Sequence, residues 1–327
     1  MLTVLAGGVG AARFLLGAVE AVDADRVTAI VNVGDDTVLH GLEVSPDLDT
    51  IVYTLAGAID PDRGWGRRDE SWRAIGEVRR LADSAGIRAD DPNGNDAAGW
   101  FALGDLDLGT HLYRTSRRRA GAALSAVTAE IAGSWGLDLR IIPVTDDPLR
   151  TVLETTDGRR LSFQEYFVRE RHDVAVRRVD LEGREQARPA PGVIEAIREA
   201  GVVVIAPSNP VVSTGPVLSV PGVEDAVHSV RDRVVAISPI VGGAALKGPA
   251  DRLLRELGHE PSVVGVAEWY APIAGTLVVD RVDAALAGRV EAAGVRCIVT
   301  DTVMGPPGVA AALARTCIDA VGTGSQP

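Results

Sequence analysis

The sequence contains very little cysteine, and this excludes several classes of protein. Its two cysteines, Cys297 and Cys317, lie outside any C-x-x-C pair or Cys/His cluster. A disulfide framework or a zinc site is therefore not expected. No stretch reaches the roughly 18 apolar residues of a membrane-spanning helix, and residues 1–6 lack the basic segment of a signal peptide. We expect a cytoplasmic protein with no membrane partner.

Positive charge is also in the minority, and lysine is almost absent. The 33 basic residues face 45 acidic ones, which gives a formal net charge of −12, and Lys247 is the only lysine. Proteins that bind nucleic acids through the phosphate backbone need a basic surface, so no nucleic-acid partner is expected. An anionic small molecule would need a local basic site or a bridging metal ion.

What the chain does have is length and a regular alternation of strand and helix patterns. Its 327 residues, 46% of them hydrophobic, are enough for a large buried core. An apolar run at 2–6 leads into glycines, a helical pattern follows at 11–22, and a β-branched run occupies 27–33. This unit predicts an α/β fold with a Rossmann-like, doubly wound, mostly parallel sheet. Further strands are predicted at 201–206, 234–237, 276–280 and 296–300, and further helices at 191–200, 223–231, 250–257 and 308–320.

The middle of the chain departs from this rhythm. Helices are predicted at 69–85 and 111–135, and strands over 139–170, where Asp157 and Gly158 form a hairpin turn. We interpret the chain as a single α/β domain with an insertion. Its core would comprise 1–60 and 190–327, and a helical lid or subdomain with a small β region would occupy about 61–190.

Glycines join the first predicted strand to its helix. Backbone N–H groups in such a turn can approach a phosphate, and the helix dipole adds positive potential. Gly8 and Gly10 fit the first two glycines of the dinucleotide pattern G-x-G-x-x-G, but Arg13 stands in place of the third. The turn at Gly7, Gly8 and Gly10, with Arg13, is therefore a candidate phosphate site without a clean NAD signature. The alternative is a tight turn beside a solvent-exposed arginine.

Aspartates gather after the predicted strands. Asp35 and Asp36 follow the second strand, and Asp47 and Asp49 lie on a predicted loop at 45–50. The carboxyl ends of parallel strands form the ligand-binding edge of such sheets, and converging carboxylates there favour a shared cation. Mg²⁺ is typically held by one or two carboxylates together with phosphate oxygens. A single aspartate is more often a turn former or helix cap, but Asp35 and Asp47 together indicate a metal site.

Two later segments end predicted strands with polar residues. Ser208 and Asn209, between two prolines, form a rigid rim suited to a base edge or carbonyl, or an ordinary strand-to-helix turn. Residues 238–247 include Lys247, a candidate phosphate ligand or a surface residue. The tryptophans of the middle region either stack on a planar ligand or pack in the core; they are Trp65, Trp72 and Trp100.

Six segments then carry a specific resemblance, in order along nearly the whole chain. They are GGVGAARF at 7–14, VNVGDD at 31–36, SPDLDT at 45–50, IDPDRGWG at 59–66, APSNP at 206–210 and SPIVGG at 238–243. Together they resemble the 2-phospho-L-lactate transferase family (CofD/FbiA type) of coenzyme F-420 biosynthesis.

The resemblance implies a reaction. A phosphorylated three-carbon acid passes from a guanosine diphosphate conjugate to Fo, the 8-hydroxy-5-deazaflavin precursor, and GMP leaves. The first segments resemble the actinobacterial type more closely, which implies a phosphoenolpyruvyl donor and dehydro-coenzyme F-420-0 as the product. The 2-phospho-L-lactyl donor is the alternative. The family also implies a Rossmann-like core with a helical lid, Mg²⁺ and a homodimer.

The resemblance implies roles for individual residues as well. Asp35 and Asp47 match the metal-site carboxylates, and Asp49 matches a residue that orients or deprotonates the attacking hydroxyl. The remaining matches are Thr110 and His111 at Fo; Gly7, Gly8, Gly10 and Arg13 at the phosphates; and Ser208 and Asn209 at the guanosine.

One position departs from the family pattern. Leu106 stands where a basic residue is expected between Asp105 and Asp107, and Arg114 is a candidate substitute. Two other interpretations stay open at this point. One is a nucleotide-sugar or NAD-type enzyme on the same sheet, and the other is a deazaflavin-binding protein that has lost transfer activity.

Overall fold

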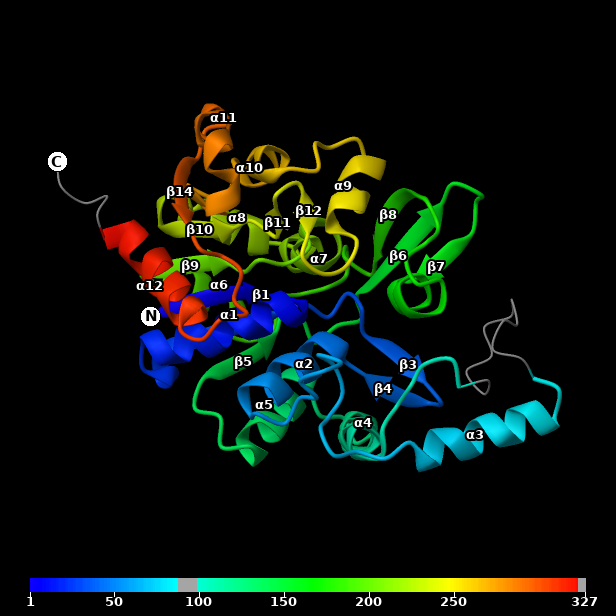
Figure 1. The fold of residues 1–327 in the computed structure, drawn as a ribbon. Coiled ribbons are helices and arrows are strands. Elements are labelled where there is room, and N and C mark those ends of the chain that lie inside the picture. Colours follow the sequence, from blue (N-terminus) through cyan, green and yellow to red (C-terminus); the bar gives the residue numbers. More distant parts are fainter. Residues whose placement is uncertain (88–98, 323–327) are drawn as a thin grey trace.

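The computed structural model describes residues 1–87 and 99–322, and its centre is a parallel sheet (Figure 1). The turn-rich polar loop that the sequence predicts at 90–95 lies outside these residues. Seven strands run in the order β14-β13-β10-β9-β1-β2-β5, with every neighbouring pair parallel. Their bounds are β1 Leu2–Ala6, β2 Val27–Val31, β5 Arg140–Pro143, β9 Val202–Ile205, β10 Val234–Ile237, β13 Thr276–Asp280 and β14 Arg296–Thr300. The predicted α/β doubly wound sheet is confirmed.

The strand order reverses beside β1. The chain first builds outward from β1 through β2 to β5, and then returns to place β9 on the other side of β1. In such sheets the crevice outside the carboxyl ends of the two strands at the reversal is the usual ligand site. The segments that follow β1, β2 and β9 therefore meet at this edge.

Helices surround the sheet, and α1 is packed closely on α12 (Figure 1). A Cβ on Gly17 of α1 would lie 2.1 Å from the carbonyl carbon of Ala310, so glycine is required for this approach. The helices are α1 Gly8–Ala21, α2 Pro46–Leu55, α3 Arg73–Ser84, α4 Asp105–Arg119, α5 Leu124–Ser134, α6 Val193–Arg198, α7 Gly215–Ser219, α8 Val223–His228, α9 Ala250–Glu256, α10 Val263–Tyr270, α11 Ala287–Ala292 and α12 Val309–Gly322. Short helical turns lie at Ala24–Arg26, Glu165–Arg169, Pro210–Thr214, Arg231–Arg233 and Arg281–Leu286.

Small antiparallel sheets accompany the main one. The hairpin predicted around Asp157 and Gly158 is confirmed as β6 and β7, and β8 pairs with the other edge of β6. These strands span Arg150–Thr155, Arg160–Ser162 and Val176–Glu182. Two further hairpins pair β3 Thr37–Leu39 with β4 Leu42–Val44, and β11 Ile240–Val241 with β12 Ala244–Ala245.

Several local predictions for the first half of the chain are wrong. The helix predicted at 111–135 is two helices, α4 and α5, separated at Gly121, whose φ of +90° a helix does not accept. The loop predicted at 45–50 is the start of α2, because Pro46 occupies the first helical position. Strand structure over 139–170 is interrupted by the helical turn Glu165–Arg169.

The predicted core of 1–60 and 190–327 leaves out one strand of the main sheet. β5 lies inside the segment interpreted as an insertion, yet it pairs with β2 along four residues. Its apolar run is short and follows two helices, so sequence alone did not assign it to the parallel sheet. Within the described residues, no helix combines the length and the apolar character needed to cross a bilayer.

Candidate active site at the reversal of the sheet

The two predicted metal-site carboxylates, Asp35 and Asp47, come together through Asn32, which directly follows β2. The Asn32 side-chain amide nitrogen donates to Asp35 Oδ1 at 3.2 Å and to Asp47 Oδ2 at 3.0 Å. Its amide oxygen accepts from the backbone N–H of Gly34 at 2.8 Å, which fixes the orientation of the amide. Asp35 and Asp47, twelve positions apart in the chain, thus face one another from the end of β2 and the first turn of α2.

Burial and mutual repulsion act on the acids of this cluster. Burial raises the pKa of Asp47 from 3.8 to about 6, against the effect of its hydrogen bonds from Asn32 and Gly8. Burial, followed by repulsion from Asp47 and Asp36, holds the pKa of Asp35 well above its usual range. Burial also raises the pKa of Asp36, although the Ser45 hydroxyl donates to it at 2.8 Å.

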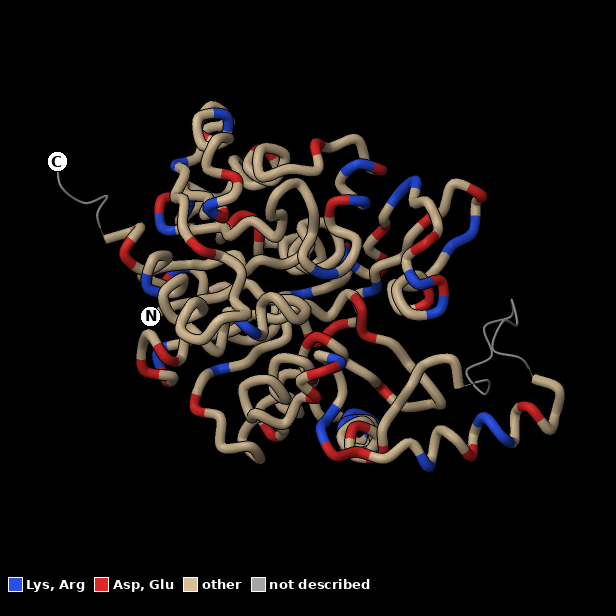
Figure 2. Tube along the Cα trace, viewed as in Figure 1, with Lys and Arg blue, Asp and Glu red and all other residues tan. Residues whose placement is uncertain are grey.

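These shifts have a direct chemical meaning. Carboxylates held so close in a dry environment gain from a divalent cation, which offsets both the burial and the repulsion. Acidic residues cluster along the segment that links β2 to β3, near the centre of the molecule (Figure 2). The donor set of buried carboxylate oxygens therefore fits Mg²⁺.

The glycine turn is shaped by the same cluster. Helix α1 begins at Gly8, earlier than the predicted start at residue 11, so Gly8 and Gly10 belong to its first turn. A Cβ on Gly7 would lie 2.9 Å from Asp47 Oδ2, and one on Gly10 would lie 2.3 Å from the Pro207 carbonyl oxygen. The Gly8 amide already donates to Asp47. The glycines therefore let α2 and the turn after β9 approach the start of α1.

Three other predicted phosphate and nucleoside residues differ in their surroundings. Ser208 is buried, and its hydroxyl donates to the Gly7 carbonyl at 2.6 Å, which ties β9 to β1 at the reversal. The Asn209 side-chain oxygen accepts from the Val211 N–H at 2.9 Å, while its amide nitrogen is buried without a partner among the described residues. Arg13 is exposed on α1, and no contact joins it to the aspartates.

A second cluster lies on the other side of α2, around Asp49. Arg114 of α4 is 2% exposed, and both of its terminal nitrogens donate hydrogen bonds to the Asp49 carboxylate, one of them at 3.1 Å to Oδ2. The same guanidinium lies 3.2 Å from His111 Nδ1. Because a guanidinium can only donate, Nδ1 must accept and the imidazole proton resides on Nε2.

Asp107 completes this second cluster. His111 Nε2 is buried, lies 3.4 Å from Asp107 Oδ1 and lacks a well-formed hydrogen bond, while the Tyr53 hydroxyl donates to the same oxygen at 2.8 Å. Burial would raise the pKa of Asp107, but the approach of His111, the hydrogen bond from Tyr53 and the charge of Arg114 hold it below its usual range. Thr110 is half-buried beside them and hydrogen-bonds Tyr53.

The atoms of Asp49, Asp107 and His111 also lie within 4.8 Å of one another, a spacing compatible with a metal ion. The guanidinium of Arg114 already neutralises Asp49 and occupies the Nδ1 lone pair of His111. A second cation here would face that buried positive charge, whereas no described residue forms an ion pair with Asp35 or Asp47. Both groups are therefore candidate metal sites, and the Asp35–Asp47 pair is the one whose charge is not already neutralised by a buried arginine.

A small pocket opens against the second cluster. Trp65 is 44% exposed and lines it together with Tyr53 and Phe101, whereas Trp72 packs edge-on against Trp65 at 6.1 Å. Trp100 instead packs edge-on against Phe101. The full lining is Val44, Pro46, Asp49, Thr50, Tyr53, Trp65, Gly66, Phe101, Ala102, Asp107 and His111. Aromatic walls beside acids and an imidazole suit a planar, polar ligand.

Leu106, which stands where the family pattern has a basic residue, does not line this pocket. It is 38% exposed at the start of α4, and its carbonyl accepts from Arg67 at 3.4 Å. Arg67 also lies over the Tyr53 ring, with its guanidinium carbon 5.8 Å from the ring centre. The candidate substitute Arg114 is engaged with Asp49, whereas Arg67 is a basic residue in direct contact with the Leu106 backbone.

Sequence reasoning missed several residues that organise the site. Asn32 stands within the VNVGDD segment, where an amide between a strand and two acids is the available signal. Tyr53 gave no signal, because its burial is defined only by the tertiary structure. Arg114 was named only as a substitute for a basic residue at position 106, and its pairing with Asp49 was missed.

Comparisons with known proteins agree with the fold and with the predicted family. Residues 2–314 match the model of a family described as "2-phospho-L-lactate transferase CofD". A phosphoenolpyruvate transferase of Streptomyces griseus is 43% identical over 324 residues and covers 97% of both chains. One from Mycolicibacterium smegmatis is 40% identical and covers 98% of both.

A solved structure supports the fold alone. Protein BH3568 of Bacillus halodurans superimposes with a TM-score of 0.60 at 18% identity, over 97% of this chain and 98% of that one. Full-length identity of 40% or more to several relatives, with a family model that spans almost the whole sequence, leaves one conclusion. The chain belongs to the CofD family.

Proposed function

We propose that the chain transfers a phosphoenolpyruvyl group from a guanosine diphosphate conjugate to Fo, forming dehydro-coenzyme F-420-0 and releasing GMP. One observation carries the mechanism. The first turn of α2 presents Asp47 toward the glycine turn and Asp35, and presents Asp49 toward Arg114 and the aromatic pocket. A donor diphosphate on one side and an acceptor hydroxyl on the other would meet at this single helical turn.

The donor side contains the proposed metal site. Asp35 and Asp47 would hold Mg²⁺, which when bound would neutralise charge on the transferred phosphoryl group. Ser208 donates to the Gly7 carbonyl and so holds the turn after β9 against the glycine turn. The amide nitrogen of Asn209, which has no partner among the described residues, is a buried donor that could bind the guanosine. Gly7, Gly8, Gly10 and Arg13 remain the proposed phosphate contacts.

The acceptor side is the aromatic pocket. The deazaflavin ring would lie against Trp65 and Phe101, with Thr110 nearby and the unpaired Nε2–H of His111 available as a donor. Asp49 is held in place by Arg114, so its oxygens can orient a ribityl hydroxyl of Fo toward the phosphorus and accept its hydrogen bond.

The bonds balance in a single displacement. The ribityl oxygen forms a bond to the phosphorus that bears the enolpyruvyl group, and the bond from that phosphorus to the bridging diphosphate oxygen breaks. GMP leaves with that oxygen, and the hydroxyl proton passes to Asp49 or to solvent. In-line positioning and charge neutralisation are the main requirements of such a transfer.

The direct test is to mix the purified protein with Fo, Mg²⁺ and the enolpyruvyl or the lactyl donor in separate reactions. Mass spectrometry should detect GMP and dehydro-coenzyme F-420-0 with the enolpyruvyl donor. Product from the lactyl donor alone would reverse the donor assignment, and no product from either would refute the function. A homodimer and a movable lid within 61–190 remain predictions of the same proposal, to be checked by light scattering and by ligand-dependent proteolysis.

A further inference from the structure

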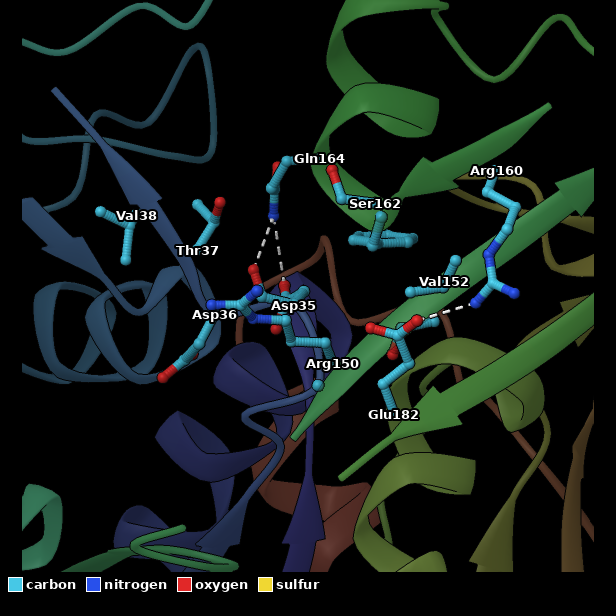
Figure 3. A pocket seen from close by; sticks show the side chains of 13 residues that line it. Asp35, Asp36, Thr37, Val38, Arg150, Val152, Arg160, Ser162, Gln164 and Glu182 are labelled. Carbon is cyan, nitrogen blue, oxygen red and sulfur yellow. Dashed lines mark hydrogen bonds and ion pairs between the residues drawn. The ribbon is translucent and has the colours of Figure 1, made fainter. Parts of the chain in front are cut away.

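A second, larger pocket lies directly beside the proposed metal site. It encloses about 370 Å³ and is bounded by the segment after β2 on one side and by the β7-β6-β8 sheet on the other (Figure 3). Its lining is Gly34, Asp35, Asp36, Thr37, Val38, Arg150, Thr151, Val152, Arg160, Ser162, Phe163, Gln164 and Glu182. None of the roles assigned above, other than that of Asp35, uses these residues.

The charges in this pocket are distributed unevenly. Arg160 and Glu182 neutralise one another, with 2.7 Å between Arg160 Nη2 and Glu182 Oε1. Arg150 is exposed, and its side chain makes no ion pair or hydrogen bond with any described residue. In Figure 3 its side chain runs back along the pocket toward Asp35 and Asp36, away from the Arg160–Glu182 pair. The pocket therefore has an uncompensated guanidinium opposite a carboxylate cluster.

The positions of these groups define the kind of ligand that fits. A divalent cation on Asp35 and Asp47 would turn the carboxylate side into a receptor for phosphoryl oxygens. A ligand there with a second anionic group a few atoms away would meet Arg150, whose planar fork suits a carboxylate. The neighbouring Val152 and Phe163 side chains are apolar, as the carbons between the two anionic groups require.

We propose that Arg150 binds the carboxylate of the three-carbon acid on the donor, and that this pocket selects a phosphorylated carboxylic acid. This inference rests on the proposed function and names a specificity residue for it. Gln164, whose amide nitrogen is 3.5 Å from Asp35 Oδ2, closes the same end of the pocket and keeps the acid next to the metal-site carboxylate. The neutral Arg160–Glu182 pair forms the outer rim and contributes little to binding.

The test compares Arg150→Met with Arg160→Met, which removes an arginine from the same pocket. Titration calorimetry with Mg²⁺ present would measure the Kd of the enolpyruvyl donor and, separately, of GDP, which lacks the acid. Loss of a charged hydrogen-bonded contact should weaken donor binding by Arg150→Met roughly 10- to 100-fold. GDP binding should be unchanged, and Arg160→Met should bind both ligands like the unmodified protein. Circular dichroism would confirm that both variants fold.

The possible results separate the inference from the function beneath it. If the unmodified protein turns over the donor but Arg150→Met binds it normally, only the inference is overturned. If Arg150→Met weakens GDP as much as the donor, Arg150 contacts the diphosphate and the carboxylate assignment is wrong. If the unmodified protein neither binds nor turns over the donor, the proposed function fails, and the carboxylate assignment fails with it.

Discussion

Asp47→Asn gives the sharpest test of the metal-site cluster, because it should remove a decline in stability that the Asp47 carboxyl causes as the pH rises. Burial raises the pKa of this carboxyl from 3.8 to about 6 in the folded protein. At this site the folded state thus binds a proton more tightly than the unfolded state. The contribution of Asp47 to stability is therefore most favourable at low pH and becomes less favourable as pH rises from about 4 to about 6. The full effect corresponds to about 3 kcal/mol of unfolding free energy at neutral pH.

The substitution also has a pH-independent cost. An asparagine oxygen can accept from either Asn32 or the Gly8 amide, but its NH₂ group then faces the other donor. That mismatch costs about 1–2 kcal/mol at every pH. The informative quantity is therefore the difference in unfolding free energy between variant and unmodified protein, followed from pH 4.5 to pH 8.

The assay is urea unfolding of the metal-free protein, monitored by circular dichroism across that pH range. From pH 4.5 upward, the unmodified protein should lose about 2 kcal/mol of stability through this carboxyl, and Asp47→Asn should not show this loss. The exposed Asp62→Asn should follow the unmodified protein. Added Mg²⁺ should stabilise the unmodified protein more at pH 8 than at pH 5, because the ion needs the ionised carboxylates. Parallel pH profiles for Asp47→Asn and the unmodified protein, or equal Mg²⁺ stabilisation of both, would refute the reasoning.

The remaining predictions concern packing around the site. Arg114→Met leaves the Asp49 carboxylate buried without its partner and should destabilise the fold by about 3–5 kcal/mol, measured by urea unfolding. Adding Asp49→Asn should recover much of this loss, and strictly additive effects of the two substitutions would contradict the pairing. Gly10→Ala places a Cβ 2.3 Å from the Pro207 carbonyl and should cost about 1–3 kcal/mol, whereas Gly109→Ala, which meets open space on α4, should not lower the unfolding midpoint.

Much of the parallel core could be predicted from sequence, because most of its strands are short apolar runs rich in β-branched residues, and several are followed closely by glycine or proline. The bounds of β10 and β13 agree with the predicted 234–237 and 276–280. β5 was harder, since four residues with two buried isoleucines are equally compatible with an insertion. Only pairing with β2 distinguishes the two.

The site was predicted unevenly for physical reasons. Asp35 and Asp47 could be grouped from the rule that strand ends converge, and the structure joins them through Asn32. The partnership of Asp49 with Arg114 spans 65 positions and depends on how α4 packs against α2. No local pattern encodes such a contact, so an arginine read as a spare cation proves to be fully engaged.

The position of β1 has a consequence for how the protein is made. One edge of this strand pairs with residues that follow it closely, since Leu2 lies opposite Val27. Its other edge pairs with β9, where Leu2 lies opposite Val202, two hundred positions later in the chain. At ordinary translation rates of about 5–20 residues per second, the second partner leaves the ribosome about 10–40 s after the first strand. During that interval a largely apolar strand has an open edge, a state prone to association with other chains. Nascent chains should therefore depend on a holding chaperone until β9 emerges.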